Sequence, residues 1–107
     1  MHIPESDWKK FKPLRDKALA RLCGRILAEV AATLSENVLS SHEKYLKMYK
    51  QVRDSDKKMG QIFDGYSRSR MLAQLSMMQS YELIEPEELE CFSTYTQEFL
   101  AGFKTRR

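Results

Sequence analysis

Apolar side chains return every three or four residues along most of the chain, and this spacing constrains the fold more than any other feature. In the first half, the apolar positions repeat at a spacing of four: Leu14, Ala18, Leu22, Ile26, Val30 and Leu34. Such a repeat places the side chains on one face of an α-helix, which we expect to be buried. Because β-branched residues are sparse and only three prolines occur, the sequence predicts an all-α protein.

Composition limits the size and class of this fold. A chain of 107 residues suits one domain, and 42% apolar with 31% charged residues suffices for a core and a polar surface. No run approaches the roughly 20 apolar residues that cross a bilayer, and the first ten residues lack the pattern of a secretion signal. We therefore expect a single helical domain over residues 1–107, without a membrane segment, in the cytoplasm.

Capping residues and prolines predict where the first helices begin. Ser6 before Asp7 favours an N-cap and an acidic first turn, so a short opening turn is expected over residues 6–12. Pro13 lies too far along for the first turn of that segment. It favours instead a new helix over residues 13–35.

A second helix is predicted to start at residue 41. The segment 35–41 is rich in Ser and Asn, which mark a connection. Ser40 and Glu43 have the three-residue spacing of a capping box. The apolar stripe of the helix that follows is Tyr45, Met48, Tyr49, Val52, Met59, Ile62 and Phe63.

Gly65 leaves the length of this second helix open. One interpretation is a long central helix over about 41–80, and the other is a break near Gly65 into helices over 41–64 and 67–80. An unbroken helix would be about 60 Å long in a domain whose expected radius of gyration is about 13 Å, so a second copy would have to cover it. A broken helix allows the pieces to fold back into a monomeric bundle.

The C-terminal quarter predicts a helical hairpin. Pro86 has the first-turn position of a short helix over 86–92, and Ser93 is placed to cap a last helix over 94–103 before a charged tail, 104–107. The fold class is therefore a small helical bundle of four to five helices.

Charge is distributed unevenly along the chain. Residues 41–80 carry eight basic against four acidic side chains, whereas residues 81–107 carry three against six. Complementary segments favour docking within the fold or between two copies. The predicted interface therefore combines the apolar stripe of the second helix with Arg68 and Arg70 pairing against Glu87, Glu88 and Glu90.

These observations favour a small helical protein-interaction or regulatory module that acts as a homodimer or docks to another protein. The alternative is a nucleic-acid-associated regulator that contacts phosphates through Lys57, Lys58, Arg68 and Arg70. Core packing is the simpler interpretation of the apolar stripe, but its tyrosines, which keep a polar tip in reach of water, favour an interface.

No pattern in the sequence indicates catalysis. Nucleophile–base arrangements, phosphate loops and metal-ligand spacings are absent from the sequence. Cys23 and Cys91 are expected to be buried thiols in a reducing compartment. We therefore expect no enzyme activity, metal, cofactor or small-molecule substrate.

Overall fold

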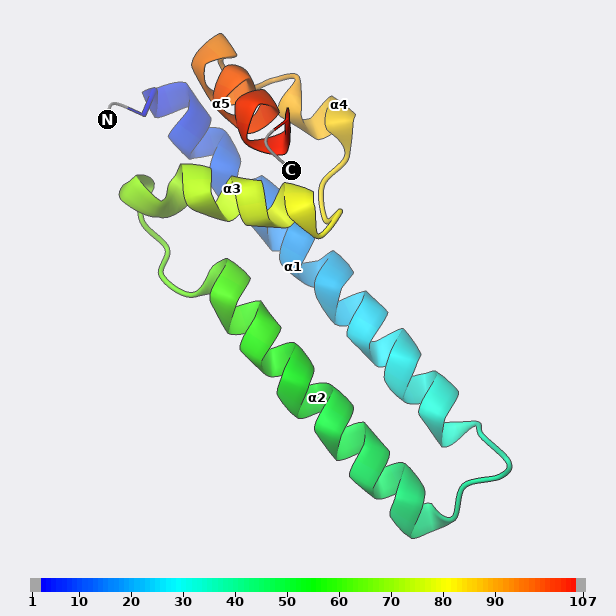
Figure 1. Ribbon diagram of the computed structural model, residues 1–107. Helices are drawn as coiled ribbons and strands as arrows, with labels where there is room; N and C mark the ends of the chain where they lie inside the picture. Colours follow the sequence, from blue (N-terminus) through cyan, green and yellow to red (C-terminus); the bar gives the residue numbers. More distant parts are fainter. Residues whose placement is uncertain (1–2, 106–107) are drawn as a thin grey trace.

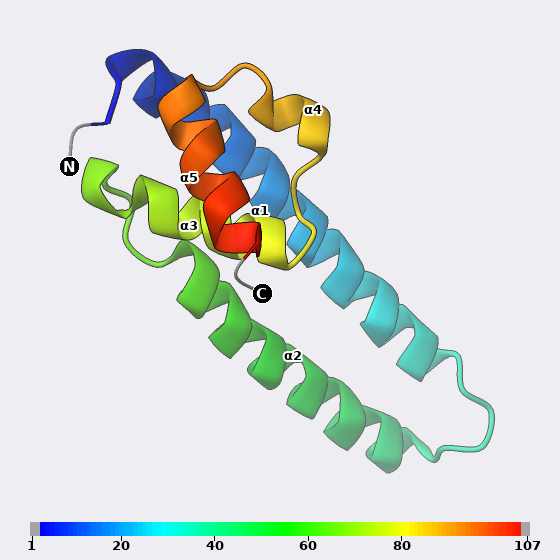
Figure 2. The same cartoon turned by 45° about the horizontal axis from the view of Figure 1, so that its top comes forward.

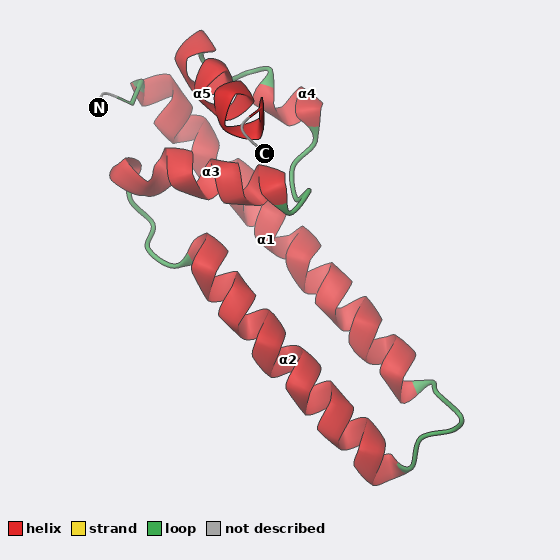
Figure 3. Ribbon diagram, viewed as in Figure 1, coloured by secondary structure: helices red, strands yellow, loops and turns green. Residues whose placement is uncertain are grey.

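The computed structural model describes residues 3–105, with side chains as far as residue 102. Within that segment the chain is helical and contains no strand (Figure 3). The elements are α1 (Glu5–Leu34), α2 (Ser41–Phe63), a 3₁₀ turn (Arg68–Arg70), α3 (Met71–Ser80), α4 (Pro86–Leu89) and α5 (Thr94–Thr105). The predicted all-α bundle is confirmed.

Two long antiparallel helices give the molecule its shape. α1 and α2 form a hairpin, and α3, α4 and α5 gather at one end of it against the N-terminal half of α1 (Figures 1 and 2). We call this end the head and residues 23–52 the distal hairpin. The principal extents are 53 × 24 × 23 Å and the radius of gyration is 16.9 Å, against about 13 Å for a compact chain of this length.

α1 runs without interruption through Pro13, so the predicted opening turn over 6–12 and the new helix from residue 13 are wrong. The helix begins at Glu5, with Pro4 and not Ser6 as its N-cap residue. Pro13 cannot donate to the carbonyl of Lys9, but both residues are exposed, so water can satisfy that carbonyl. The 30-residue helix tolerates the missing hydrogen bond because tertiary packing fixes the segments on both sides.

α2 begins at the predicted capping box and ends before Gly65. The Ser40 hydroxyl accepts from the Glu43 N–H at 3.1 Å, and the Glu43 carboxylate accepts from the Ser40 N–H at 2.8 Å. Gly65 has a φ of 79°, in the left-handed region where glycine is least strained. The break near Gly65 is therefore the correct alternative, and the unbroken helix over 41–80 is not formed.

The hydrophobic core lies entirely in the head. α1 contributes apolar residues only as far as Leu22, and α2 only from Ile62 onward. Ile26 and Val30 are half-buried and Leu34 is 52% exposed, so the expectation of one buried face along all of α1 is wrong beyond Leu22. The core residues are Ile3, Phe11, Leu14, Ala18, Leu22, Ile62, Phe63, Met71, Leu72, Leu75, Met78, Leu83, Phe92 and Leu100.

The C-terminal helices differ slightly from their predicted bounds. α4 ends at Leu89 and not at residue 92, because the chain then turns toward the N-cap of α5. α5 continues to Thr105, two residues into the predicted tail, and residues 106–107 lie outside the described segment.

A buried carboxylate joins the two ends of the chain. Asp7 Oδ1 accepts from the Ser93 N–H at 2.9 Å, and Oδ2 accepts from the hydroxyls of Ser93 and Thr96, each at 2.6 Å. Burial alone would raise the pKa of this carboxyl, but the hydrogen bonds from Ser93 and Thr96 outweigh burial and lower the pKa of Asp7. The start of α5 is thereby fixed to the first turn of α1.

Candidate interaction surface

Polar contacts hold the two helices of the distal hairpin together. The Thr33 hydroxyl donates to Gln51 Oε1 at 3.0 Å, and Lys44 Nζ donates to the Leu34 carbonyl at 3.0 Å. Lys47 forms an ion pair with Glu36 at 2.8 Å next to the connecting loop. Thr33 is the one buried residue of this region among those described. The helices therefore meet through hydrogen bonds more than through a hydrophobic core.

Large apolar side chains of the same region face solvent. Leu27 is 67% exposed and Leu34 is 52% exposed on α1, while Tyr45, Tyr49 and Val52 on α2 are 58%, 55% and 47% exposed. Val30 and Met48 are half-buried. We call this set the apolar face: Leu27, Val30, Leu34, Tyr45, Met48, Tyr49 and Val52.

Helical spacing places these residues on one side of the hairpin. Thr33 and Gln51 contact each other, so they mark the direction in which each helix faces its neighbour. Leu34 follows Thr33 and Val52 follows Gln51. Each is rotated by about 100° about its helix axis relative to the residue before it. Because the helices run antiparallel, equal rotations along the two chains turn both side chains toward the same side.

The other members follow the same pattern. Val30 and Met48 lie three positions before Thr33 and Gln51 respectively, and Leu27 and Tyr45 lie six positions before them. Both offsets correspond to a rotation in the same sense as that of Leu34 and Val52. Tyr49 lies at the outer edge of the face. The distal hairpin is thus a layer two helices wide with one apolar side.

The other side of the layer is charged. A residue four positions before, or three after, a given residue is rotated in the opposite sense. Glu29 lies four before Thr33, Lys47 four before Gln51, and Asp54 three after Gln51. The apolar face therefore lies on one side of the layer, and Leu46, which is 51% exposed, lies outside it.

The structure divides the predicted apolar stripe into two parts. Tyr45, Met48, Tyr49 and Val52 lie on the apolar face and stay predicted interface residues. Ile62 and Phe63 are buried in the head, and the half-buried Met59 packs against its core, so these three lie outside the apolar face. Leu27, Val30 and Leu34 were not predicted as interface residues, because the sequence pattern assigned Val30 and Leu34 to a buried stripe.

The predicted pairing of Arg68 and Arg70 with Glu87, Glu88 and Glu90 is not formed within the chain. Arg68 pairs with Glu5. The two arginines precede α3 and the glutamates follow it, so the length of α3 separates the two groups.

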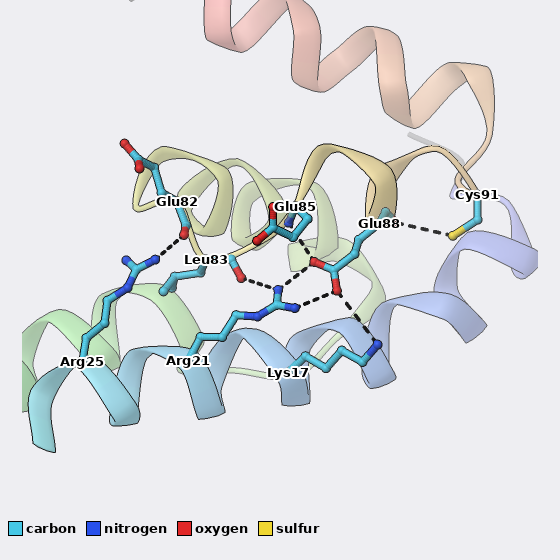
Figure 4. Close-up of polar contacts among 8 residues, drawn as sticks. All are labelled: Lys17, Arg21, Arg25, Glu82, Leu83, Glu85, Glu88 and Cys91. Atoms are coloured by element: carbon cyan, nitrogen blue, oxygen red, sulfur yellow. Dashed lines mark hydrogen bonds and ion pairs between the residues drawn. The ribbon is translucent and has the colours of Figure 1, made fainter. Parts of the chain in front are cut away.

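Glu88 instead joins α4 to α1 (Figure 4). Its carboxylate accepts two hydrogen bonds from the Arg21 guanidinium, at 2.6 and 3.0 Å, and lies 3.9 Å from Lys17 Nζ. Arg21 also donates to the Leu83 carbonyl at 2.9 Å. The hydrogen bonds from Arg21 lower the pKa of Glu88 to about 2. This network attaches the C-terminal hairpin to α1. Arg25, at the start of the distal hairpin, extends it by donating to the Tyr81 carbonyl at 2.7 Å and to the Glu82 carbonyl.

The four basic residues of the nucleic-acid alternative do not form one group. The Arg68 guanidinium lies over the Trp8 ring, 5.6 Å from its centroid, before α3 begins. Lys58 Nζ lies 5.3 Å from the ring centroid of Tyr81, at the far end of α3. Lys57 and Arg70 are exposed. Nucleic-acid binding therefore stays a prediction from the sequence, and none of the described contacts gathers these four residues into one site.

The head contains an open depression of about 640 Å³ between α3, α4 and α5, lined in part by Ile84, Leu89 and Leu100. No group of three potential metal ligands occurs among the described residues. Cys23 is half-buried and Cys91 is exposed, both as free thiols. The expectation that both thiols are buried is therefore wrong for Cys91, which lies between α4 and α5 and outside the core.

No protein-family model, curated protein or solved structure matches this chain. In the described part of the chain, none of the helices combines the length and the apolar character needed to cross a lipid bilayer.

Proposed function

We propose that this chain is a small cytoplasmic protein-interaction module that binds a protein surface through the apolar face of its distal hairpin and catalyses no reaction itself. The observation that carries the proposal is the exposure of Leu27, Leu34, Tyr45, Tyr49 and Val52 on one side of a two-helix layer. Contiguous apolar patches of this kind are typical of protein-binding sites.

The size of the apolar face favours a role in binding. Five large side chains about half exposed present on the order of 500 Å² of apolar surface. Burying that area would yield on the order of 10 kcal/mol before the costs of association are subtracted. Polar contacts such as Thr33–Gln51 hold the hairpin together, so the apolar side chains are available to a partner.

Site-specific photocrosslinking in intact cells tests this function. A benzophenone amino acid replaces Tyr49, which lies on the apolar face and is 55% exposed. We expect ultraviolet light to convert a substantial fraction of the chain into a covalent adduct with a protein, because the probe would lie inside an interface.

Leu46 provides the matched control position. It is 51% exposed on the same helix, but it lies five residues before Gln51, a rotation of about 140° in the sense opposite to that of Val52, and so points away from the apolar side of the layer. Adducts at Tyr49 without adducts at Leu46 support the proposal. Absence of any adduct at Tyr49, in cells where the chain is folded, would contradict it.

A further inference from the structure

We infer that the surface bound by the apolar face is the apolar face of a second copy of this chain, so that two distal hairpins form a four-helix bundle. This inference rests on the proposed function and names its partner. Two-helix layers that each bury one apolar side against the other are the two halves of such a bundle. A two-fold axis lets one surface patch serve both copies.

α1 and α2 contribute residues at equivalent positions to the apolar face. The offsets of its residues from Thr33 equal the offsets from Gln51: three before for Val30 and Met48, one after for Leu34 and Val52. The two helices therefore present their apolar side chains to the same side, with Leu34 and Val52 beside the Thr33–Gln51 contact, Val30 nearer the head and Met48 nearer the connecting loop. A flat layer with these properties fits the same layer from a second copy.

The charges of α1 and α2 favour one pairing of helices between the two copies. α2 carries six basic and three acidic side chains, whereas α1 carries only Arg25 and Glu29 between residues 23 and 34. Packing α2 against α2 of the second copy would bring like charges together, including Arg53, whose guanidinium lies 5.7 Å from the Tyr49 ring centroid at the edge of the face. Packing α2 against α1 of the second copy avoids this repulsion. The two-fold axis then runs parallel to the helices, and both heads lie at the same end of the bundle.

The available area meets the requirement of a stable dimer. Each copy contributes on the order of 500 Å² of apolar surface, so two copies bury on the order of 1,000 Å² together with the polar rim. Specific interfaces bury at least about 1,000 Å² in total. The apolar face of two copies therefore reaches the lower end of the size range of specific interfaces.

Light scattering on the purified full chain tests the inference. The chain mass is 12.6 kDa, and we expect the wild type to scatter with twice this mass at micromolar concentration. Val52→Asp should raise the dimer dissociation constant at least tenfold, because it places a charge inside the interface. The control Leu46→Asp, of similar exposure on the same helix, should leave the dissociation constant within about twofold.

Folding is monitored by circular dichroism for each variant. If Val52→Asp loses helicity, Leu27→Asp on the other helix replaces it, since Leu27 is 67% exposed. A wild type of 12.6 kDa up to roughly 100 μM, or equal dissociation constants for Val52→Asp and Leu46→Asp, would overturn the inference. An adduct between the Tyr49 probe and a different protein would also overturn it while leaving the proposed function intact.

Disulfide trapping tests the pairing of helices. Leu34→Cys and Val52→Cys are made separately, each with both native cysteines replaced by serine, and the two proteins are then mixed and oxidised. We expect the mixed disulfide between the two variants to dominate. Dominance of Leu34→Cys homodimers would instead show α1 against α1 and would overturn the assigned orientation.

Discussion

At the scale of single residues, one ion pair decides where the C-terminal hairpin attaches to α1. The Arg21 guanidinium is bidentate on Glu88, the geometry in which charge-assisted hydrogen bonds are strongest. Glu88 Oε1 also accepts from the Glu85 N–H at 2.7 Å and so caps α4. One carboxylate thereby serves both the local helix start and the tertiary contact.

Removing the charge of Glu88 should lower the free energy of unfolding and make that free energy less dependent on pH in the acidic range. The pKa of Glu88 is lowered from its usual value to about 2 in the folded chain, so its contribution is complete above the unfolded pKa near 4.5 and is lost as pH falls toward 2. Glu88→Gln should lower the free energy of unfolding at pH 7 by about 1–3 kcal/mol, measured by urea denaturation.

The same measurement at pH 3 supplies the internal control for this prediction. The difference between wild type and Glu88→Gln should shrink there, because wild-type Glu88 has begun to take up its proton in the unfolded state. A difference that stays constant from pH 7 to pH 3 would show that the ionised carboxylate is not the stabilising species.

At the scale of elements, local signals decide where the helices start and stop. The capping box of Ser40 and Glu43 fixes the start of α2, and the positive φ of Gly65 allows the chain to turn away after α2 ends. Because α3 then crosses α1 (Figure 1), the second half of the chain returns to the head. No further helix covers the distal hairpin in the described part of the chain.

Two glycines should respond oppositely to alanine. At Gly65 a Cβ would meet Arg70 Nε at 3.0 Å, and the φ of 79° disfavours any other residue, so Gly65→Ala should cost about 1–2 kcal/mol of stability. At Gly24, in the middle of α1, a Cβ meets nothing within 4 Å. Gly24→Ala should therefore stabilise the chain by about 0.5–1 kcal/mol.

Thermal denaturation of both variants checks this pair of predictions. A lower midpoint for Gly65→Ala and a higher midpoint for Gly24→Ala are expected. Equal midpoints would mean that the turn after α2 does not need a left-handed residue.

At the scale of the whole molecule, the head and the distal hairpin differ in what stabilises them. The head buries a continuous core, whereas the distal hairpin depends on polar contacts and helix propensity. Isolated helices gain little stability without tertiary packing. Association through the apolar face would give the distal hairpin the packing that the single chain does not provide.

Small-angle X-ray scattering should show an extended particle. For the Val52→Asp monomer we expect a radius of gyration near the 16.9 Å of this structure, in contrast to about 13 Å for a compact fold of equal length. A value near 13 Å would mean that the distal hairpin folds back onto the head in solution, and the apolar face would then be an internal surface.

Much of the fold was predictable because its signals are local. Helical periodicity and the capping box at Ser40 act within a few residues, and they correctly predicted an all-α fold and the start of α2. The glycine at position 65 left a continuous and a broken helix open, and the structure has the break. The break at Pro13 was predicted wrongly for the same reason, since a local rule cannot include the packing of Phe11 and Leu14 on either side of the proline.

Only the tertiary structure decided which apolar residues are core and which are surface. Leu22 and Leu34 belong to the same stripe of α1, yet one is buried under the head and the other is exposed. Periodicity determines the face of a helix on which a side chain lies, but burial depends on which segment arrives to cover that face. The path of α3, α4 and α5 over one end of the hairpin makes that choice, and it leaves the apolar face of the distal hairpin open.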